Sequence, residues 1–195
     1  MNHRPLFEVR KLRLTPIDLE KDSAVVAQWT TDLVLARRLR SEQPVRPLAV
    51  FEARKVLDNW VKEHERSKNA FLYALRPLDD DSLVGMIRIS GVMWVHGAAV
   101  LDLMIGSTGN WAAYAQDALN LGLQYAFDEL NLFRIQVQVE ENDEPGCALY
   151  SSANFYLEVR QRQAVYHQGR YWDRLHFGLL RPEWAAYSQQ VGVAV

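Results

Sequence analysis

The stretch that decides the fold runs from Val100 to Phe155 and reads VLDLMIGSTGNWAAYAQDALNLGLQYAFDELNLFRIQVQVEENDEPGCALYSSANF. Residues 100–105 form a nearly continuous apolar run, which is typical of a buried strand. A turn of small residues at 111–114 precedes helical spacing over about 115–130, and residues 133–139 alternate as a strand does. A strand, a turn that directs backbone N–H groups to one point and a helix N-terminus together predict an anion-binding site.

The rest of the chain supplies the remaining elements of one α/β domain. The predicted elements are strands at 9–14, 70–75, 83–89 and 99–105, helices at 18–28, 33–39 and 49–68, and a closing hairpin of 157–166 and 171–180. The hairpin turns at Gln168–Gly169, and Pro182–Trp184 is expected to end the ordered part. This order predicts a single domain over residues 1–195, with a central mixed β-sheet flanked by helices.

Composition narrows the class of protein. The 195 residues suit one compact domain, and 49% hydrophobic with 24% charged residues is ordinary for a globular protein. A formal net charge of −2 gives no electrostatic reason to expect nucleic acid as a partner. The one cysteine, Cys147, fits a reducing compartment. No apolar run reaches the roughly 20 residues that span a bilayer, and the N-terminus lacks the apolar core of a signal peptide. We therefore expect a cytoplasmic protein with no membrane partner.

Several motifs, none of them specific alone, occur together in one order. They are Leu12–Pro16, Leu83–Ile87, Leu119–Arg134, the pair Leu149–Tyr150 with Phe155, and Tyr166 with Gly169–Tyr171 and Asp173. Over nearly the whole chain this order resembles the GCN5-related N-acetyltransferase (GNAT) superfamily. Within it, the motifs resemble the ribosomal-protein alanine N-acetyltransferases and their relatives that act on small amines. The resemblance implies acetyl-CoA as co-substrate and a primary amine as acceptor, on a peptide N-terminus or a small metabolite.

The phosphate-binding turn departs from that resemblance. The family's turn reads about W-G-K-G-Y-G-T-E-A-L, whereas residues 111–119 read W-A-A-Y-A-Q-D-A-L, with every glycine replaced and one residue fewer. Each alanine held in a left-handed conformation costs on the order of 1 kcal/mol. The residues that the resemblance assigns to the cofactor are Ile105, Trp111, Ala112, Ala113, Tyr114, Ala115 and Gln116. We expect weakened acetyl-CoA binding, and the alternative function is a catalytically degenerate fold that binds a ligand or a protein partner.

Two side chains are the predicted catalytic groups. The resemblance places Tyr150 at the position of the general acid that protonates the CoA thiolate, and a tyrosine pKa of about 10 suits that role. Asp102 lies in the middle of an apolar strand, where an unpaired carboxylate is costly to bury, so it is the candidate base. A purely structural role stays open for both: packing for Tyr150, and an ion pair or solvent exposure for Asp102. After the second core strand, where the resemblance implies an Asn that contacts the cofactor, either Asn142 or Asp143 is the candidate for that role.

The remaining candidates are weaker. His96, His167 and His176 have no metal-ligand spacing, so no metal is expected; His167 could line an amine-substrate mouth, and His176 is explained by packing. Cys147 has no evident neighbouring base and is interpreted as a small buried helix residue rather than a nucleophile. The acceptor's identity and the oligomeric state stay open, although the apolar closing hairpin is compatible with a homodimer.

Overall fold

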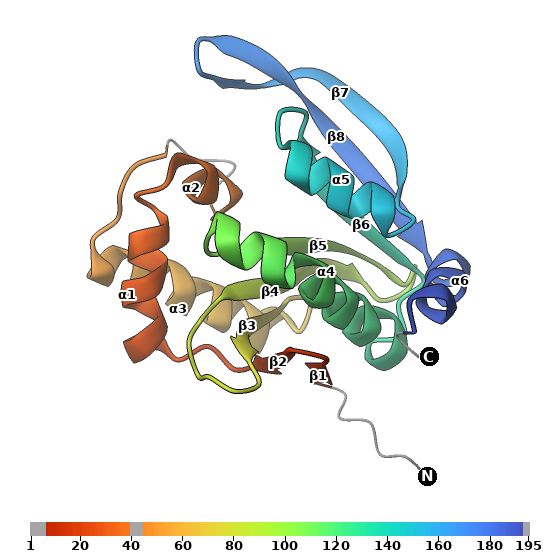
Figure 1. The fold of residues 1–195 in the computed structure, drawn as a ribbon, viewed down its shortest axis with the longest axis horizontal. Coiled ribbons are helices and arrows are strands. Elements are labelled where there is room, and N and C mark those ends of the chain that lie inside the picture. The colour runs from red at the N-terminus through yellow and green to blue at the C-terminus, as the bar shows by residue number, and fades with distance from the viewer. Residues whose placement is uncertain (1–6, 40–44, 193–195) are drawn as a thin grey trace. The chain divides into compact units, whose positions relative to one another are not determined.

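A computed structural model describes residues 7–39 and 45–192 of the chain (Figure 1). Its eight strands are hydrogen-bonded in the order β1-β2-β3-β4-β5-β6-β8-β7. The strands are β1 Glu8–Val9, β2 Leu12–Thr15, β3 Phe71–Pro77, β4 Gly85–Met93, β5 Ala98–Ile105, β6 Arg134–Glu140, β7 Tyr156–His167 and β8 Arg170–Leu180. The helices are α1 Leu19–Trp29, α2 Leu33–Leu39, α3 Val50–Ser67, α4 Thr108–Gln124, its π-helical continuation η1 Tyr125–Glu129, α5 Glu144–Ser152 and α6 Arg181–Val191.

The sheet is mixed, which confirms the predicted fold class. β5 and β6 are parallel, because the α4 crossover carries the chain back between them, whereas β2–β3, β3–β4, β6–β8 and β7–β8 are antiparallel. The hairpin turn at Gln168 and Gly169 is also confirmed, since both residues have positive φ, of 53° and 78°.

The C-terminal end of the chain corrects a prediction. Pro182 does not end the ordered part; it lies in the first turn of α6, where its missing N–H would be unsatisfied anyway. The Glu183 carboxylate accepts a hydrogen bond from the Leu180 N–H at 2.7 Å and so caps this helix. Trp184 is only 2% exposed and stacks on Phe127 with ring centroids 6.1 Å apart. The buried Trp184 therefore packs the segment that begins at Pro182 against the rest of unit 2, although the sequence predicts that the ordered part ends there.

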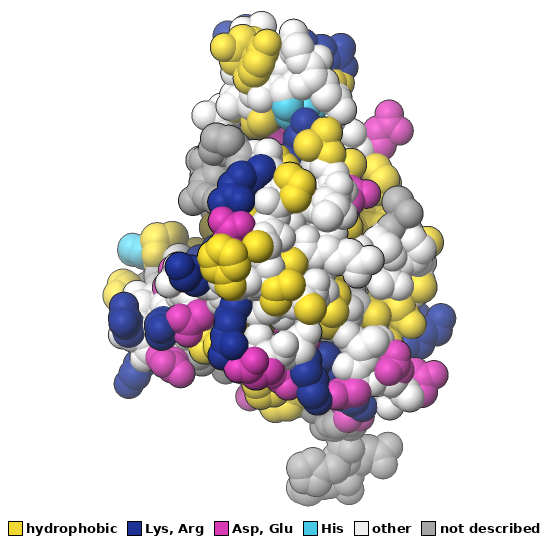
Figure 2. All heavy atoms as spheres, turned by 90° about the vertical axis from the view of Figure 1, so that its left-hand side faces the viewer, with side chains coloured by type: hydrophobic (Ala, Val, Ile, Leu, Met, Phe, Trp, Pro, Cys, Tyr) yellow, Lys and Arg dark blue, Asp and Glu magenta, His cyan; other side chains and the backbone are white. Residues whose placement is uncertain are grey.

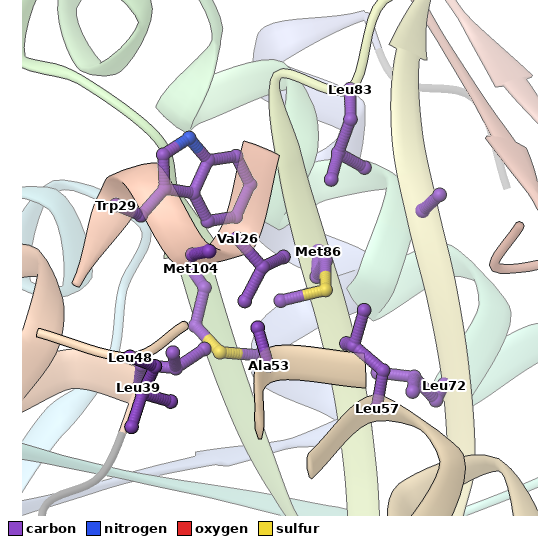
Figure 3. Packing of buried hydrophobic residues seen from close by; sticks show 12 residues of the cluster. Val26, Trp29, Leu39, Leu48, Ala53, Leu57, Leu72, Leu83, Met86 and Met104 are labelled. Carbon is purple, nitrogen blue, oxygen red and sulfur yellow. The ribbon is translucent and has the colours of Figure 1, made fainter. Parts of the chain in front are cut away.

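The chain divides into two compact units, which are described separately. Unit 1 comprises residues 1–90 and 103–122. Its core brings Trp29 of α1, Leu57 of α3 and the strand residues Met86 and Met104 into one cluster (Figure 3). In the same unit, the Arg76 Nη2 donates to both carboxylate oxygens of Asp22, each at 2.9 Å. The periodic apolar faces that predicted α1 and α3 are thus the faces that form this core.

The surface of unit 1 is mostly mixed in character. Figure 2 shows hydrophobic side chains scattered among charged ones on the side that carries α1 and α2. Four of the exposed apolar residues belong to α2 and the start of α3: Leu33, Val34, Val50 and Phe51. Among the described residues, no helix is both long enough and apolar enough to cross a bilayer.

Unit 2 comprises residues 91–102 and 123–195. Its strands are the first part of β5 together with β6, β8 and β7, and α5 runs over β6 and β8 (Figure 1). The register joins Ile135 to Leu179, Val137 to Phe177 and Val139 to Leu175. All six side chains are buried, so we call this side of the unit 2 strands the apolar face.

Candidate active site

In unit 1, the end of β5 is fixed by close packing at Gly106. Its N–H donates to the Val84 carbonyl at 2.9 Å. A Cβ added to Gly106 would lie 2.3–2.5 Å from three atoms of the Trp29 indole, closer than any real contact. Glycine is therefore required here for space, and the close packing against Trp29 fixes where α4 begins.

Helix α4 begins at Thr108, seven residues earlier than predicted. Ser107 caps it: the Oγ accepts from the Asn110 N–H at 3.0 Å, and the Ser107 carbonyl accepts from the Trp111 N–H at 2.7 Å. The prediction that the backbone of residues 111–114 forms a turn is therefore wrong, because these residues are helical. The physical reason is propensity, because alanine is the best helix former and this stretch has no glycine to break the helix.

This correction changes which N–H groups are available to an anion. The residues assigned to the cofactor turn are helical: Trp111, Ala112, Ala113, Tyr114, Ala115 and Gln116. Their N–H groups belong to the helical ladder and cannot converge on a phosphate. The N–H groups that a helix leaves unbonded lie in its first turn, here at Thr108 and Gly109. Any cofactor contact of residues 112–116 therefore has to come from side chains.

The charged groups around this part of α4 are also fixed within unit 1. The Arg38 guanidinium lies 4.0 Å from the Trp111 ring centroid, in a cation–π contact. Asp117 is buried and lies 3.9 Å from Arg10. Asp117 is in the third turn of the helix, so it does not act on the helix N-terminus, where a carboxylate would repel phosphate.

In unit 2, the paired part of β5 and β6 is short. The pairing joins Ala98 to Arg134, Ala99 to Ile135 and Val100 to Gln136, although β6 continues to Glu140. Residues paired across a parallel ladder point to the same face, and side chains alternate along each strand. Ala99 therefore shares the apolar face with Ile135, and Val100 shares the opposite side with Gln136. We call that opposite side the polar face; it carries Asp102, Gln136, Gln138, Glu140, Arg174 and His176.

Tyr150 is buried on the apolar face. It lies in α5 and is 5% exposed. Its ring meets Phe155 edge-on at 5.5 Å between centroids and Phe177 at 6.3 Å. A Cβ on Gly146, one turn earlier in α5, would lie 3.0 Å from Val139. Close packing of α5 against β6 and β8 thus holds the tyrosine, which resides where the sequence placed it, after the second core strand.

Asp102 lies on the polar face of β5. It is half-buried and shares its side of the strand with Val100, two residues earlier. Asp102 comes two residues after the last pair that joins β5 to β6. The sequence predicts that the Asp102 carboxylate shares a cleft with the Tyr150 hydroxyl. That prediction is wrong, because the structure brings Asp102 and Tyr150 to opposite faces of the same group of strands. A base at Asp102 would therefore have to act from the other side of the strands than Tyr150.

The loop after β6 contains the predicted cofactor residue Asn142. The neighbouring Asp143 caps α5, because its carboxylate accepts from the Gly146 N–H at 3.1 Å. The Asn142 Oδ1 is buried and, among the described residues, has no hydrogen-bond partner. A buried unsatisfied acceptor of this kind is rare in native proteins and fits a ligand with an N–H group.

His167, a weak candidate from the sequence, belongs to a cluster of polar and aromatic side chains in unit 2. The His167 Nε2 lies 2.6 Å from a carboxylate oxygen of Glu140, and the ring stacks on Trp172. The Arg170 guanidinium lies 3.4 Å from the Trp172 ring centroid, in a cation–π contact. The His167 Nδ1 is buried without a partner in the described chain. Only its place beside the Gln168–Gly169 turn signalled it in the sequence.

Cys147 and His96 are the remaining titratable candidates, and neither belongs to the polar clusters described above. Burial raises the pKa of the Cys147 thiol, and the nearby Asp143 carboxylate raises it further, which opposes a nucleophilic role. His96 is exposed in the turn after β4. Over residues 7–39 and 45–192, no group of three or more His, Cys, Asp and Glu side chains could hold a metal ion.

Comparison with known proteins identifies the family. The sequence profile of the acetyltransferase (GNAT) domain matches residues 25–176. The chain belongs to the GNAT acetyltransferases. A protein of Bacillus licheniformis named "Uncharacterized N-acetyltransferase p20" is 23% identical over 175 residues, which are 90% of this chain and 96% of that one. The spermidine N(1)-acetyltransferase of Vibrio cholerae is 23% identical over 108 residues, which are 55% of this chain and 62% of the enzyme.

Solved structures of GNAT proteins share the fold. The spermidine N-acetyltransferase of Vibrio cholerae, solved in complex with CoA and spermine, superposes with a TM-score of 0.74 at 18% identity, over 89% of this chain and 97% of that one. A GCN5-related N-acetyltransferase from Brucella melitensis gives a TM-score of 0.72 at 21% identity, over 96% of this chain and 83% of that one. At these identities the likeness shows the fold alone.

Proposed function

We propose that this GNAT protein transfers the acetyl group of acetyl-CoA to a primary amine. The observation that carries the proposal is that a carboxylate, Asp102, lies just past the last β5–β6 pair on the polar face, while a buried phenol, Tyr150, lies on the apolar face. Acetyl transfer needs a group that removes the amine proton and a group that protonates the departing thiolate. Asp102 on the polar face suits the first task and Tyr150 on the apolar face suits the second.

The proposed reaction is a direct transfer in a ternary complex. The amine nitrogen attacks the thioester carbonyl carbon from the polar face, a C–N bond forms and the C–S bond breaks. The amine proton passes to the Asp102 carboxylate, directly or through water, and the Tyr150 hydroxyl gives its proton to the CoA thiolate. The products are an N-acetyl amine and free CoA, and solvent restores the two side chains to their starting protonation states.

The residues present fit acetyl-CoA in part. The buried Asn142 Oδ1 can accept a hydrogen bond from an amide N–H, of which the pantetheine arm has two. In unit 1, the first-turn N–H groups of α4 at Thr108 and Gly109 can bind a phosphate oxygen, since a helix N-terminus favours anions. Acetyl-CoA supplies the activated acyl group when bound. We expect its affinity to be weaker than in a protein with a glycine-rich turn, because fewer N–H groups converge.

The acceptor class is proposed from the relatives. Two enzymes similar to this chain, from Vibrio cholerae and Escherichia coli, are named spermidine N(1)-acetyltransferases. A small primary amine is therefore the first class of acceptor to test, with peptide N-termini as the second. The oligomeric state stays open, and the closing hairpin is compatible with a homodimer.

The helical course of residues 111–116 favours a second function. In this chain the residues expected to form the cofactor-binding turn are helical. Such a chain could keep the fold and serve as a ligand-binding or protein-interaction module. Such a protein would release no thiol from acetyl-CoA in the presence of any amine. A ligand-binding module could still be stabilised by CoA, whereas a protein-interaction module would show no stabilisation by CoA.

Two measurements test these functions together. Purified protein is incubated with acetyl-CoA and a panel of amines and peptides, and free CoA thiol is followed. In parallel, thermal unfolding is measured with CoA, where ligand at 100 times its dissociation constant adds about 2.7 kcal/mol. Amine-dependent thiol release supports the enzyme. Stabilisation by CoA without thiol release supports the binding module. If there is neither thiol release nor stabilisation by CoA, a protein-interaction role remains.

A further inference from the structure

We propose that the ion pair between Glu158 and Arg134 positions Tyr150, so that both charged side chains are positioning residues for the candidate acid. The inference rests on the proposed function, in which the Tyr150 hydroxyl protonates the CoA thiolate. It concerns unit 2 alone and links a charged contact on the polar face to a ring that packs on the apolar face.

Glu158 of β7 reaches across β8 to Arg134 of β6. Its two carboxylate oxygens accept from the guanidinium, one from Nη1 at 2.9 Å and the other from Nη2. The carboxylate crosses β8 at Gly178, where an added Cβ would lie 2.5 Å from three atoms of that group. Glycine is therefore required at this point for space. A two-point contact between planar groups fixes their orientation as well as their distance.

Packing does not hold the start of β7. Every residue from Tyr156 to Gln163 is exposed, so the burial of apolar surface contributes little there. The pairing of β7 with β8 also shifts between Leu157 and Val159, and a bulge of this kind disrupts the ladder locally. The ion pair of Glu158 acts at this shift. The Glu158 and Arg134 side chains are 33% and 28% exposed, so solvent screens the pair less than a fully exposed one.

The start of β7 is joined directly to Tyr150. Phe155, the residue before β7, is buried and meets the Tyr150 ring edge-on at 5.5 Å between centroids. The Phe155 N–H donates to the Tyr150 carbonyl at 3.1 Å. On β8, Phe177 meets the same ring at 6.3 Å and is paired with Leu157, the residue before Glu158. A displacement of β7 at Glu158 therefore changes the packing of the Tyr150 ring.

The effect on catalysis follows from the role of the hydroxyl. A general acid has to lie within hydrogen-bond reach of the atom that it protonates, and a misplacement of about 1 Å can cost on the order of 100-fold in rate. In the proposed reaction neither Glu158 nor Arg134 touches acetyl-CoA or the amine. Loss of the ion pair should therefore lower kcat and leave both KM values unchanged.

A set of variants with a matched control tests this link. Glu158→Gln and Arg134→Met each remove the ion pair, and the double variant removes the same contact only once. Arg160→Gln is the control, because Arg160 lies two residues further along β7 and pairs with Glu141 and Asp173 instead. We expect each ion-pair variant to lower kcat roughly tenfold, and the double variant to lose no more than either single one. Arg160→Gln should keep the wild-type kcat.

A second readout does not depend on turnover. The ring signal of Tyr150 in a carbon–proton NMR spectrum of tyrosine-labelled protein is assigned by its absence in Tyr150→Phe. It should move in Glu158→Gln and in Arg134→Met and stay in place in Arg160→Gln. This pattern in a protein that acetylates no amine would refute the proposed function and keep the link between the ion pair and Tyr150. Losses of kcat that add up in the double variant, an equal loss in Arg160→Gln, or an unmoved Tyr150 signal would each overturn the inference.

Discussion

The Asp102 side chain and the Tyr150 ring lie on opposite faces of the strands that β5, β6 and β8 form in unit 2. Asp102 shares its face with Val100 and Gln136, whereas Tyr150 packs on Phe177 across the strands. In the proposed acetyl transfer, such an arrangement would separate the two proton transfers in space. It also predicts that replacing Asp102 and replacing Tyr150 reduce activity independently of each other.

Tyr150→Phe should lower kcat by roughly 100-fold or more while CoA affinity stays nearly unchanged. The ring contacts with Phe155 and Phe177 survive this substitution, so the melting temperature should change little. The measurement is steady-state thiol release together with thermal unfolding. Tyr156→Phe, at an exposed position on β7, is the matched control and should keep full activity. Equal rates in the two variants would reduce Tyr150 to a packing role.

Asp102→Asn should lower kcat/KM for the amine at neutral pH and leave CoA affinity intact, because the amide keeps the shape and loses the basicity. The deficit should shrink as the pH is raised, since more of the amine is then already deprotonated. Rates over a pH series check this. A deficit of the same size at every pH would indicate that Asp102 has a structural role, such as an ion pair, and the base would have to be sought elsewhere.

Gly106→Ala should destabilise unit 1 by about 1–3 kcal/mol, the usual cost of overpacking. The added Cβ would meet the rigid Trp29 indole at 2.3–2.5 Å, and the indole is itself held in the core. Gly109→Ala is the control, because its Cβ would meet only the Ser107 Oγ at 3.9 Å. Urea unfolding of both variants separates them, and a Gly106→Ala protein as stable as the control would show that Trp29 can move aside.

Ala112→Gly and Ala113→Gly should each cost about 1 kcal/mol, because both positions are exposed and helical. If these residues formed a glycine-tolerant turn, the same changes would be neutral or stabilising. Denaturant unfolding of the two single variants decides between a helix and a turn. Ser107→Ala should cost a similar amount, since it removes the cap.

The sequence predicted the elements well and their ends less well. Alternation in residues 133–139 and the Gln168–Gly169 turn predicted β6 and the closing hairpin, because local residue types determine both. The start of α4 was misplaced, since the prediction carried over a turn from other family members, whereas the alanines here favour helix. Pro182 was read as a stop, although a proline also starts helices. The pairing of residues distant in sequence, such as Glu140 with His167, depends on register and could not be read from spacing.

Cys147 should react slowly with iodoacetamide near neutral pH. Burial and the Asp143 carboxylate hold its pKa above the ordinary value, so the reactive thiolate is scarce in the folded protein. The rate should rise with pH and level off at a higher pH than it does for a free thiol. Unfolding in urea should bring the rate to that of a free thiol. A fast reaction in the folded state would identify Cys147 as an activated thiol and reopen its role.

Asp173 should contribute to stability in a pH-dependent way. Its pKa is lowered from 3.8, first by the hydrogen bond from the Gln163 N–H and then by Arg160, so the folded protein favours the carboxylate form. A lowered pKa gives stability that is complete above the unfolded value and is lost as the pH falls through the folded value. Asp173→Asn should therefore have a slightly lower melting temperature than the wild type near neutral pH. The gap should close as the pH falls below the carboxylate's folded pKa. Thermal unfolding across the acid range checks this, with Asp32→Asn, an exposed residue of unit 1, as a carboxylate comparison. A gap that stays constant down to the lowest pH would mean that the charge of Asp173 contributes nothing and that the Asn variant acts through geometry alone.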